Sequence, residues 1–151
     1  MAETAASILD SVKKNIGLGS NYDVFDLSIM THINTTFDTL TQLGIGPAEG
    51  FMIEDAEATW DSYLGPSPLL NSVKSYLYLK VKMLFDPPDN SFVLTSMEKQ
   101  ATELEWRILV TRDELLSSVD GIPAFVVVNP PLETEPTEIH AEVDGGGADL
   151  E

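Results

Sequence analysis

Apolar residues recur every three or four positions along most of the first 118 residues, a spacing that places them on one face of an α-helix. The longest such run spans residues 25–43 and predicts a helix of about 20 residues that ends at Gly44. Shorter runs predict four further helices, at residues 4–16, 54–64, 69–85 and 91–117. The body shows no useful stretch of alternating apolar and polar residues. The pattern therefore predicts an all-α fold, a small bundle of about five helices over residues 1–118.

The pattern changes in residues 119–151, which are rich in acidic residues, proline and glycine. One short apolar run, AFVVV at residues 124–128, lies between Pro123 and Pro130 and predicts a single short strand. No other strand is predicted in the chain, so we expect this one to add to a sheet edge of a partner, through Phe125, Val126, Val127 and Val128. The alternative is a solvated, disordered acidic segment. The sequence thus divides into a helical body, residues 1–118, and an extended acidic C-terminal arm, residues 119–151.

The charge of the chain is strongly negative and unevenly distributed. It has 25 acidic and 8 basic residues, a formal net charge of −17. All eight bases lie at or before Arg112, whereas residues 113–151 contain ten acids and no base. Tight DNA binding without sequence preference requires Lys and Arg to neutralise phosphates, so this composition argues against it. It is compatible with DNA that passes nearby without binding.

The residues that carry chemistry form no catalytic or metal-binding pattern. The absence of cysteine excludes disulfides and thiolate metal sites. The two histidines, His32 and His140, do not belong to an HExxH motif, and neither a nucleophile elbow nor a phosphate-binding glycine loop is present. The sequence therefore predicts no enzyme, no metal site and no cofactor. It also contains no apolar run of about 18 residues, so we expect no association with a membrane.

The helix expected at residues 69–85 has two unusual features. Its polar positions include Lys74, Lys80 and Lys82, a concentration of positive charge in an acidic protein. Tyr76 and Tyr78 point about 200° apart, so they cannot both face one core. Either the body is packed on two sides, by its own core and by a neighbouring subunit, or one tyrosine is exposed. We predict that Lys74, Lys80, Lys82 and Tyr78 contact a protein partner; the alternative is that the lysines only solubilise the helix.

Several segments of the body occur in an order that is informative when they are taken together. They are ILDSVKKNIGL (8–18), FDLSIMTHINTTFDTLTQLGIGPAEGF (25–51), ATWDSYLG (58–65), VKSYLYLKVKMLFDPP (73–88) and NSF with MEKQATELEWR (90–107). In these segments the chain resembles the head-to-tail connector proteins of long-tailed phages, in the actinobacteriophage branch. The resemblance spans about 100 residues, and the arm matches no pattern.

The resemblance implies a structural virion protein of the neck, assembled in the host cytoplasm. Such proteins form an adaptor ring, usually a dodecamer, between the portal and the stopper or tail-completion proteins, with DNA passing through the lumen without specific binding. The family has no catalytic residues to transfer to this chain. Two other functions remain open from the sequence: an acidic mimic of DNA, and a helical accessory protein that binds another protein.

Overall fold

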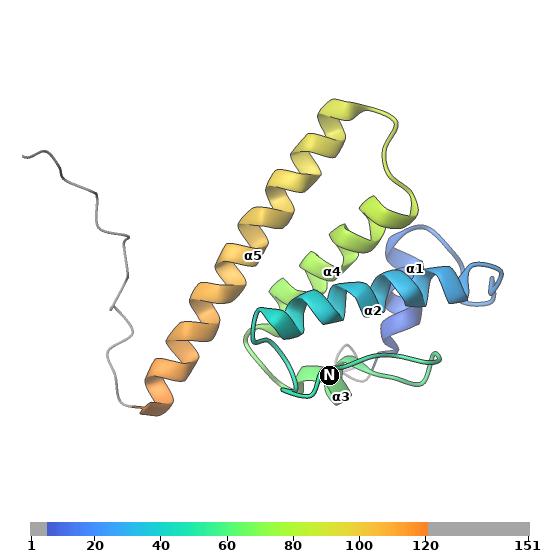
Figure 1. Ribbon diagram of the computed structural model, residues 1–151. Coiled ribbons are helices and arrows are strands. Elements are labelled where there is room, and N and C mark those ends of the chain that lie inside the picture. The colour runs from blue at the N-terminus through green and yellow to red at the C-terminus, as the bar shows by residue number, and fades with distance from the viewer. Residues whose placement is uncertain (1–5, 121–151) are drawn as a thin grey trace, which may run out of the picture.

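Five helices form the regular structure of residues 6–120, the part of the chain that the computed structural model describes (Figure 1). Within these residues, β structure is limited to an isolated antiparallel bridge between Ser7 and Thr59. The all-α prediction is therefore confirmed for the body. The strand predicted at residues 124–128 lies outside the described residues. The helices are α1 (Ile8–Asn15), α2 (Asp26–Gln42), α3 (Trp60–Leu64), α4 (Leu70–Phe85) and α5 (Ser91–Asp120).

The helix end predicted at Gly44 is confirmed, and a glycine also ends α1. After α2, Gly44 adopts a φ of +78°, a conformation that is strained for residues with a Cβ. Its N–H donates to the carbonyl of Thr41, and the next N–H, of Ile45, donates to the carbonyl of Leu40. This pair of bonds is the Schellman motif, and Leu40 and Ile45, the positions that commonly form its apolar contact, are both buried. Gly17 ends α1 in the same way, with a φ of +88°.

The helix predicted at residues 54–64 is much shorter in the structure, because residues 54–59 are not helical. The Asp55 carboxylate accepts the N–H of Glu57, a local turn that competes with a helix. The hydroxyl of Thr59 then accepts the N–H of Ser62 and starts α3 at Trp60 with a capping box. Ala56, which would lie on the apolar side of a helix at residues 54–64, is exposed. The backbone of this segment pairs instead with the start of α1, where the N–H of Ile8 donates to the carbonyl of Ala58.

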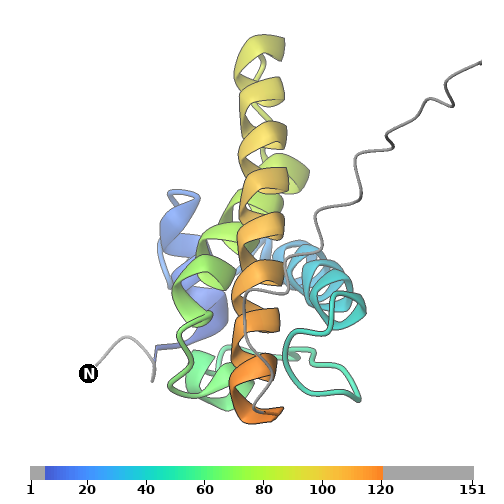
Figure 2. The same cartoon turned by 90° about the vertical axis from the view of Figure 1, so that its left-hand side faces the viewer.

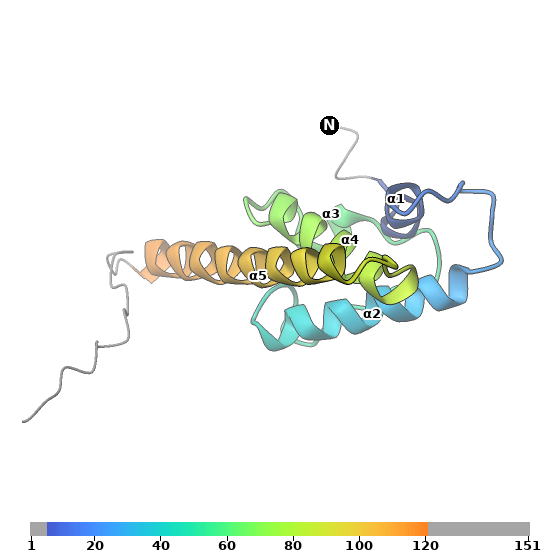
Figure 3. The same cartoon turned by 90° about the horizontal axis from the view of Figure 1, so that it is seen from above.

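Helix α4 occupies the centre of the bundle. It packs against α2 and α5 along its length and against α1 at one side. Seen from the side of α5, α1 and α2 lie on opposite sides of the α4–α5 pair (Figure 2). The view from above shows α5 lying along α4 and α2 (Figure 3). The buried apolar side chains come from all five helices, the loop before α3 and the residue just before α4: Ile8, Leu9, Val12, Ile29, Ile33, Phe37, Leu40, Ile45, Ile53, Trp60, Tyr63, Leu69, Leu70, Val73, Tyr76, Leu77, Val81, Ala101 and Ile108.

An aromatic cluster joins α2, α3 and the loop between them. The ring of Phe37 lies 4.5 Å from that of Tyr63, 5.1 Å from that of Phe51 and 6.4 Å from that of Trp60, between centroids. Burial raises the pKa of Tyr63 above its usual range, so its hydroxyl keeps its proton. The loop is fixed by Asn34, whose amide donates to the carbonyl of Ile53 and accepts its N–H. These contacts hold the short α3 against the bundle.

The two tyrosines of α4 both pack within their own subunit. Tyr76 is buried, and its hydroxyl donates to Glu105 Oε2 of α5 at 3.3 Å. Burial, reinforced by the Glu105 carboxylate, raises the pKa of Tyr76 to about 12. Tyr78 is half-buried, and its ring packs edge-on against Trp60 at 6.0 Å between centroids. The opposed directions of the side chains are therefore explained by α5 on one side of α4 and α3 on the other.

Candidate protein-docking surfaces

A stripe of side chains on α4 combines two of the predicted lysines with Tyr78. Lys74, Tyr78 and Lys82 follow one another at intervals of four residues, so they share one side of the helix. The Lys74 ammonium lies over the Trp60 ring, 5.5 Å from its centroid. Lys82 forms an ion pair with Asp86, just beyond the helix end. The Trp60–Tyr78 contact thus supports the middle of the stripe.

The third predicted lysine, Lys80, projects from a different side of α4. It lies two residues from both Tyr78 and Lys82, about 200° round the helix axis. The lysines treated as one group in the sequence therefore do not share one face. The other predicted contact residues, Phe125, Val126, Val127 and Val128, lie outside the described residues. The partner contacts of all these residues remain predictions.

Two shallow hollows meet at Tyr78 and form a groove along the α4 stripe. The larger, of about 390 Å³, lies between α1 and α4, and the smaller, of about 210 Å³, continues toward α5. The charged residues lining the two hollows are Lys14, Lys74, Lys82 and Asp10. We call this surface the basic groove. Its remaining lining includes Ala6, Ser7, Ser11, Asn15, Ser20, Ser75, Leu79, Gln100 and Leu104.

The outer side of α5 exposes large apolar side chains. Trp106 is 63% exposed and Phe92 is 78% exposed, and Val110, one turn after Trp106, is also exposed. Trp106 lies two residues before buried Ile108, about 200° round the helix, so it faces away from the bundle. An exposed tryptophan of this kind is typical of a protein interface. The sequence analysis missed this surface, although the position of Trp106 outside the apolar stripe of α5 could have indicated it.

A second apolar surface lies where the start of α2 meets the end of α4. The ring of Phe25 lies 5.8 Å from that of Tyr22 and 5.4 Å from that of Phe85, between centroids. The residues near these rings in the sequence include three exposed apolar side chains, those of Val24, Leu27 and Leu84. This surface and the outer side of α5 come from different elements. One subunit therefore carries two distinct apolar surfaces, as head-to-tail contacts between copies require.

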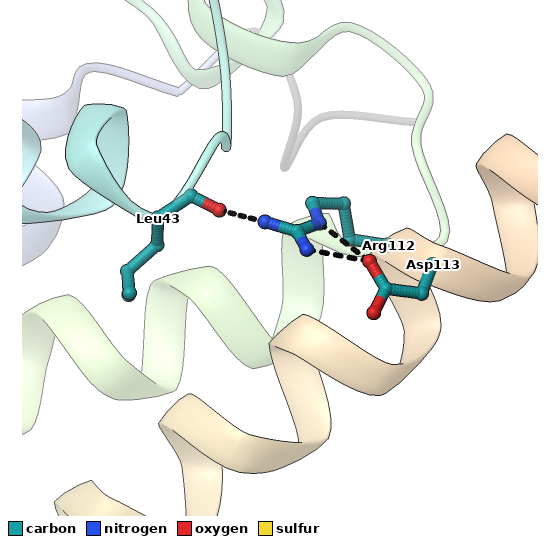
Figure 4. A network of polar contacts seen from close by, with 3 residues as sticks. All are labelled: Leu43, Arg112 and Asp113. Atoms are coloured by element: carbon teal, nitrogen blue, oxygen red, sulfur yellow. Dashed lines mark hydrogen bonds and ion pairs between the residues drawn. The ribbon is translucent and has the colours of Figure 1, made fainter. Parts of the chain in front are cut away.

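Arg112 fixes the C-terminal half of α5 to the rest of the bundle. Its guanidinium donates to the carbonyl of Leu43 at the end of α2 and also pairs with Asp113 (Figure 4). The Leu43 carbonyl is available because α2 ends there. A Cβ at position 44 would lie 3.0 Å from Arg112 Nη1, so the guanidinium would have to shift by a few tenths of an ångström to accommodate it. Arg112 thereby joins α5 to the end of α2, in addition to the packing of α5 against α4.

We expect Arg112→Met to lower the free energy of unfolding by about 1–2 kcal/mol, because the Leu43 carbonyl loses a charged donor. Arg107→Met is the matched control, since Arg107 pairs with Glu103 on an exposed side of α5 and should change stability by less than about 0.5 kcal/mol. Urea unfolding measures both variants. Equal losses in the two variants would show that the contact with α2 does not stabilise the bundle.

The comparison with protein families identifies the chain. A family model described as "Phage connector protein" matches residues 8–115, more than two thirds of the sequence. The chain belongs to this family. No curated protein and no solved structure matches it. The connector resemblance found in the sequence is thus confirmed at the level of the family, while the actinobacteriophage branch remains a prediction.

Membership in the connector family makes the chain a structural protein of the virion, in the region that joins head to tail. A structural family also fits the expectation that the chain is not an enzyme. Among residues 6–120, no group of three or more His, Asp or Glu side chains is arranged to hold a metal ion. None of the helices in this range is long and apolar enough to cross a membrane.

Proposed function

We propose that this connector protein forms a ring beneath the portal and joins it to the stopper or tail-completion proteins. The ring is a dodecamer that matches the portal, and DNA passes through its lumen without specific binding. The observation that carries this proposal is the family match over nearly the whole helical body. The two separate apolar surfaces support it, because head-to-tail contacts between unlike surfaces generate rings when the rotation closes.

The charge of the chain suits a wall past which DNA moves. Carboxylates that line a channel repel phosphates and keep the duplex from adhering. The same charge opposes spontaneous assembly, since twelve copies of a −17 chain bring about 200 negative charges together. We infer that free subunits are monomers or weak oligomers and that the portal templates the ring. In this arrangement Lys74, Lys80 and Lys82 face protein neighbours and not the DNA axis.

A reconstruction of the virion neck by electron cryomicroscopy tests the proposal. The expected result is a ring of helical subunits directly beneath the portal into which the α1–α5 bundle fits, with a lumen free of lysine and arginine clusters. Finding the chain only outside virions, bound to a soluble DNA-binding protein, would instead support an acidic mimic of DNA and overturn the proposal.

The outer side of α5 provides a second test. Trp106→Glu should leave the subunit folded, because the side chain is 63% exposed, yet should give DNA-filled heads without attached tails. Thr35→Glu, the same charge change at an exposed position of α2, is the control and should assemble normally. Electron micrographs of lysates and circular dichroism of the purified variants provide the measurements. Normal necks in the Trp106→Glu phage would exclude this face from the interface.

A further inference from the structure

The basic groove is lined by charges of mostly the opposite sign to the net charge of the chain. Three lysines and one aspartate line it, whereas the chain as a whole carries −17. The lysines come from two helices: Lys14 lies in the last turn of α1, and Lys74 and Lys82 lie two turns apart on α4. The half-buried ring of Tyr78 lies between the α4 lysines and gives the groove an apolar floor. Such a surface fits an extended acidic peptide with occasional apolar residues.

We propose that this groove binds the acidic segment 133–144 of the C-terminal arm of a second copy of the chain. The segment, ETEPTEIHAEVD, contains five acids and no lysine or arginine. The α4 lysines are separated by about 12 Å along the helix axis, from a rise of 1.5 Å per residue. Glu135 and Glu138 are separated by about 10 Å in an extended chain, so both can reach the groove at once. Ile139 and Val143 supply the apolar side chains that Tyr78 accommodates.

The direction of α5 favours a second copy over the subunit's own arm. The helix carries the chain from the α4–α5 turn to the end of the bundle that lies opposite α1 (Figures 1 and 3). The arm of the same subunit has to return along the bundle to reach Lys14, whereas the arm of a neighbour does not. The proposal goes beyond the connector role and does not depend on it, because the chain can join head and tail with or without this contact.

Hydrogen exchange of the full chain tests the groove directly. At low salt, exchange in segment 133–144 should slow by about tenfold as the protein concentration rises from about 10 µM to about 1 mM. This is the weak affinity that several exposed ion pairs together are expected to give. Raising the salt to about 0.5 M should remove this protection, because exposed charges are then screened. The triple variant Lys14→Gln, Lys74→Gln, Lys82→Gln should also remove it.

The matched control replaces three bases outside the groove, as Lys80→Gln, Lys99→Gln, Arg107→Gln, and should keep the protection.

Carbodiimide coupling in an equal mixture of ¹⁴N and ¹⁵N chains should join groove lysines to arm carboxylates in mixed-isotope pairs. Absence of protection at about 1 mM overturns the proposal, as does equal loss of protection in the control. If the protection is independent of concentration and the couplings join only chains of the same isotope, the arm binds the groove of its own subunit. That result overturns the proposal that a second copy supplies the arm.

Discussion

Replacing Lys13 by methionine is expected to lower the free energy of unfolding by about 3 kcal/mol, because it leaves a partly buried carboxylate without its counter-charge. Lys13 is only 1% exposed, and its ammonium lies 2.8 Å from Asp26 Oδ1 at the start of α2. The same ammonium donates to the carbonyl of Ser20 at 3.0 Å. One buried side chain thus ties α1, the following loop and α2 together. Urea unfolding, with the slope compared between variants, measures the loss.

Lys14→Met is the matched control for this prediction, since the neighbouring lysine is exposed and should change stability by less than about 0.5 kcal/mol. The double variant Lys13→Met, Asp26→Asn should recover part of the loss, because it also removes the stranded charge. If Lys13→Met costs no more than Lys14→Met, the ion pair does not stabilise the bundle, and the loop is held by its apolar contacts alone.

Gly46→Ala is expected to cost about 3 kcal/mol, through two separable effects. Gly46 has a φ of +84°, which costs a residue with a Cβ about 1–2 kcal/mol. The new methyl group would also lie 2.6 Å from Tyr63 Cε2. Tyr63 cannot move aside, because it is 4% exposed and its ring packs against Phe37 and Phe51. Overpacking of this kind adds about 1–3 kcal/mol.

Gly17→Ala isolates the backbone part of this effect. Gly17 has nearly the same φ, +88°, but nothing lies within 4 Å of the position of its Cβ. We therefore expect it to cost about 1 kcal/mol, with the near-ultraviolet circular dichroism of the aromatic cluster unchanged. Thermal or urea unfolding of both variants gives the comparison. Equal losses would mean that the aromatic cluster yields to the added methyl group and is less rigid than its packing indicates.

The helices that could be predicted are those whose signals are local. In α2 and α5, apolar residues keep a helical period over many turns, and burying one face follows from that period alone. Gly17, Gly44 and the Asp86-Pro87-Pro88 turn end helices through backbone restrictions that act within a few residues. Local signals also gave the wrong prediction of a helix at residues 54–59. Their composition suits a helix start, but their backbone pairs with residues near Ser7, fifty or more positions away.

The sequence analysis named Lys74, Lys80, Lys82 and Tyr78 as one group, because all four are on one predicted helix. Four-residue spacing places Lys74, Tyr78 and Lys82 on a shared side of that helix and leaves Lys80 on another. The groove could not, because Lys14 of α1 and Gln100 of α5 join it only when those helices pack beside α4. The exposure of Trp106 likewise depends on which side of α5 the bundle covers.

The sequence by itself determined the helical class, most helix ends, the strong negative charge and the connector resemblance, since these depend on composition, period and ordered segments. The tertiary structure alone decided that Lys13 is buried against Asp26, that Arg112 joins α5 to the end of α2, and that the basic groove exists. The reason is physical. A helix fixes the directions of its side chains, but their burial and charge environment depend on neighbours that are remote in the chain and are brought together only by packing of the core.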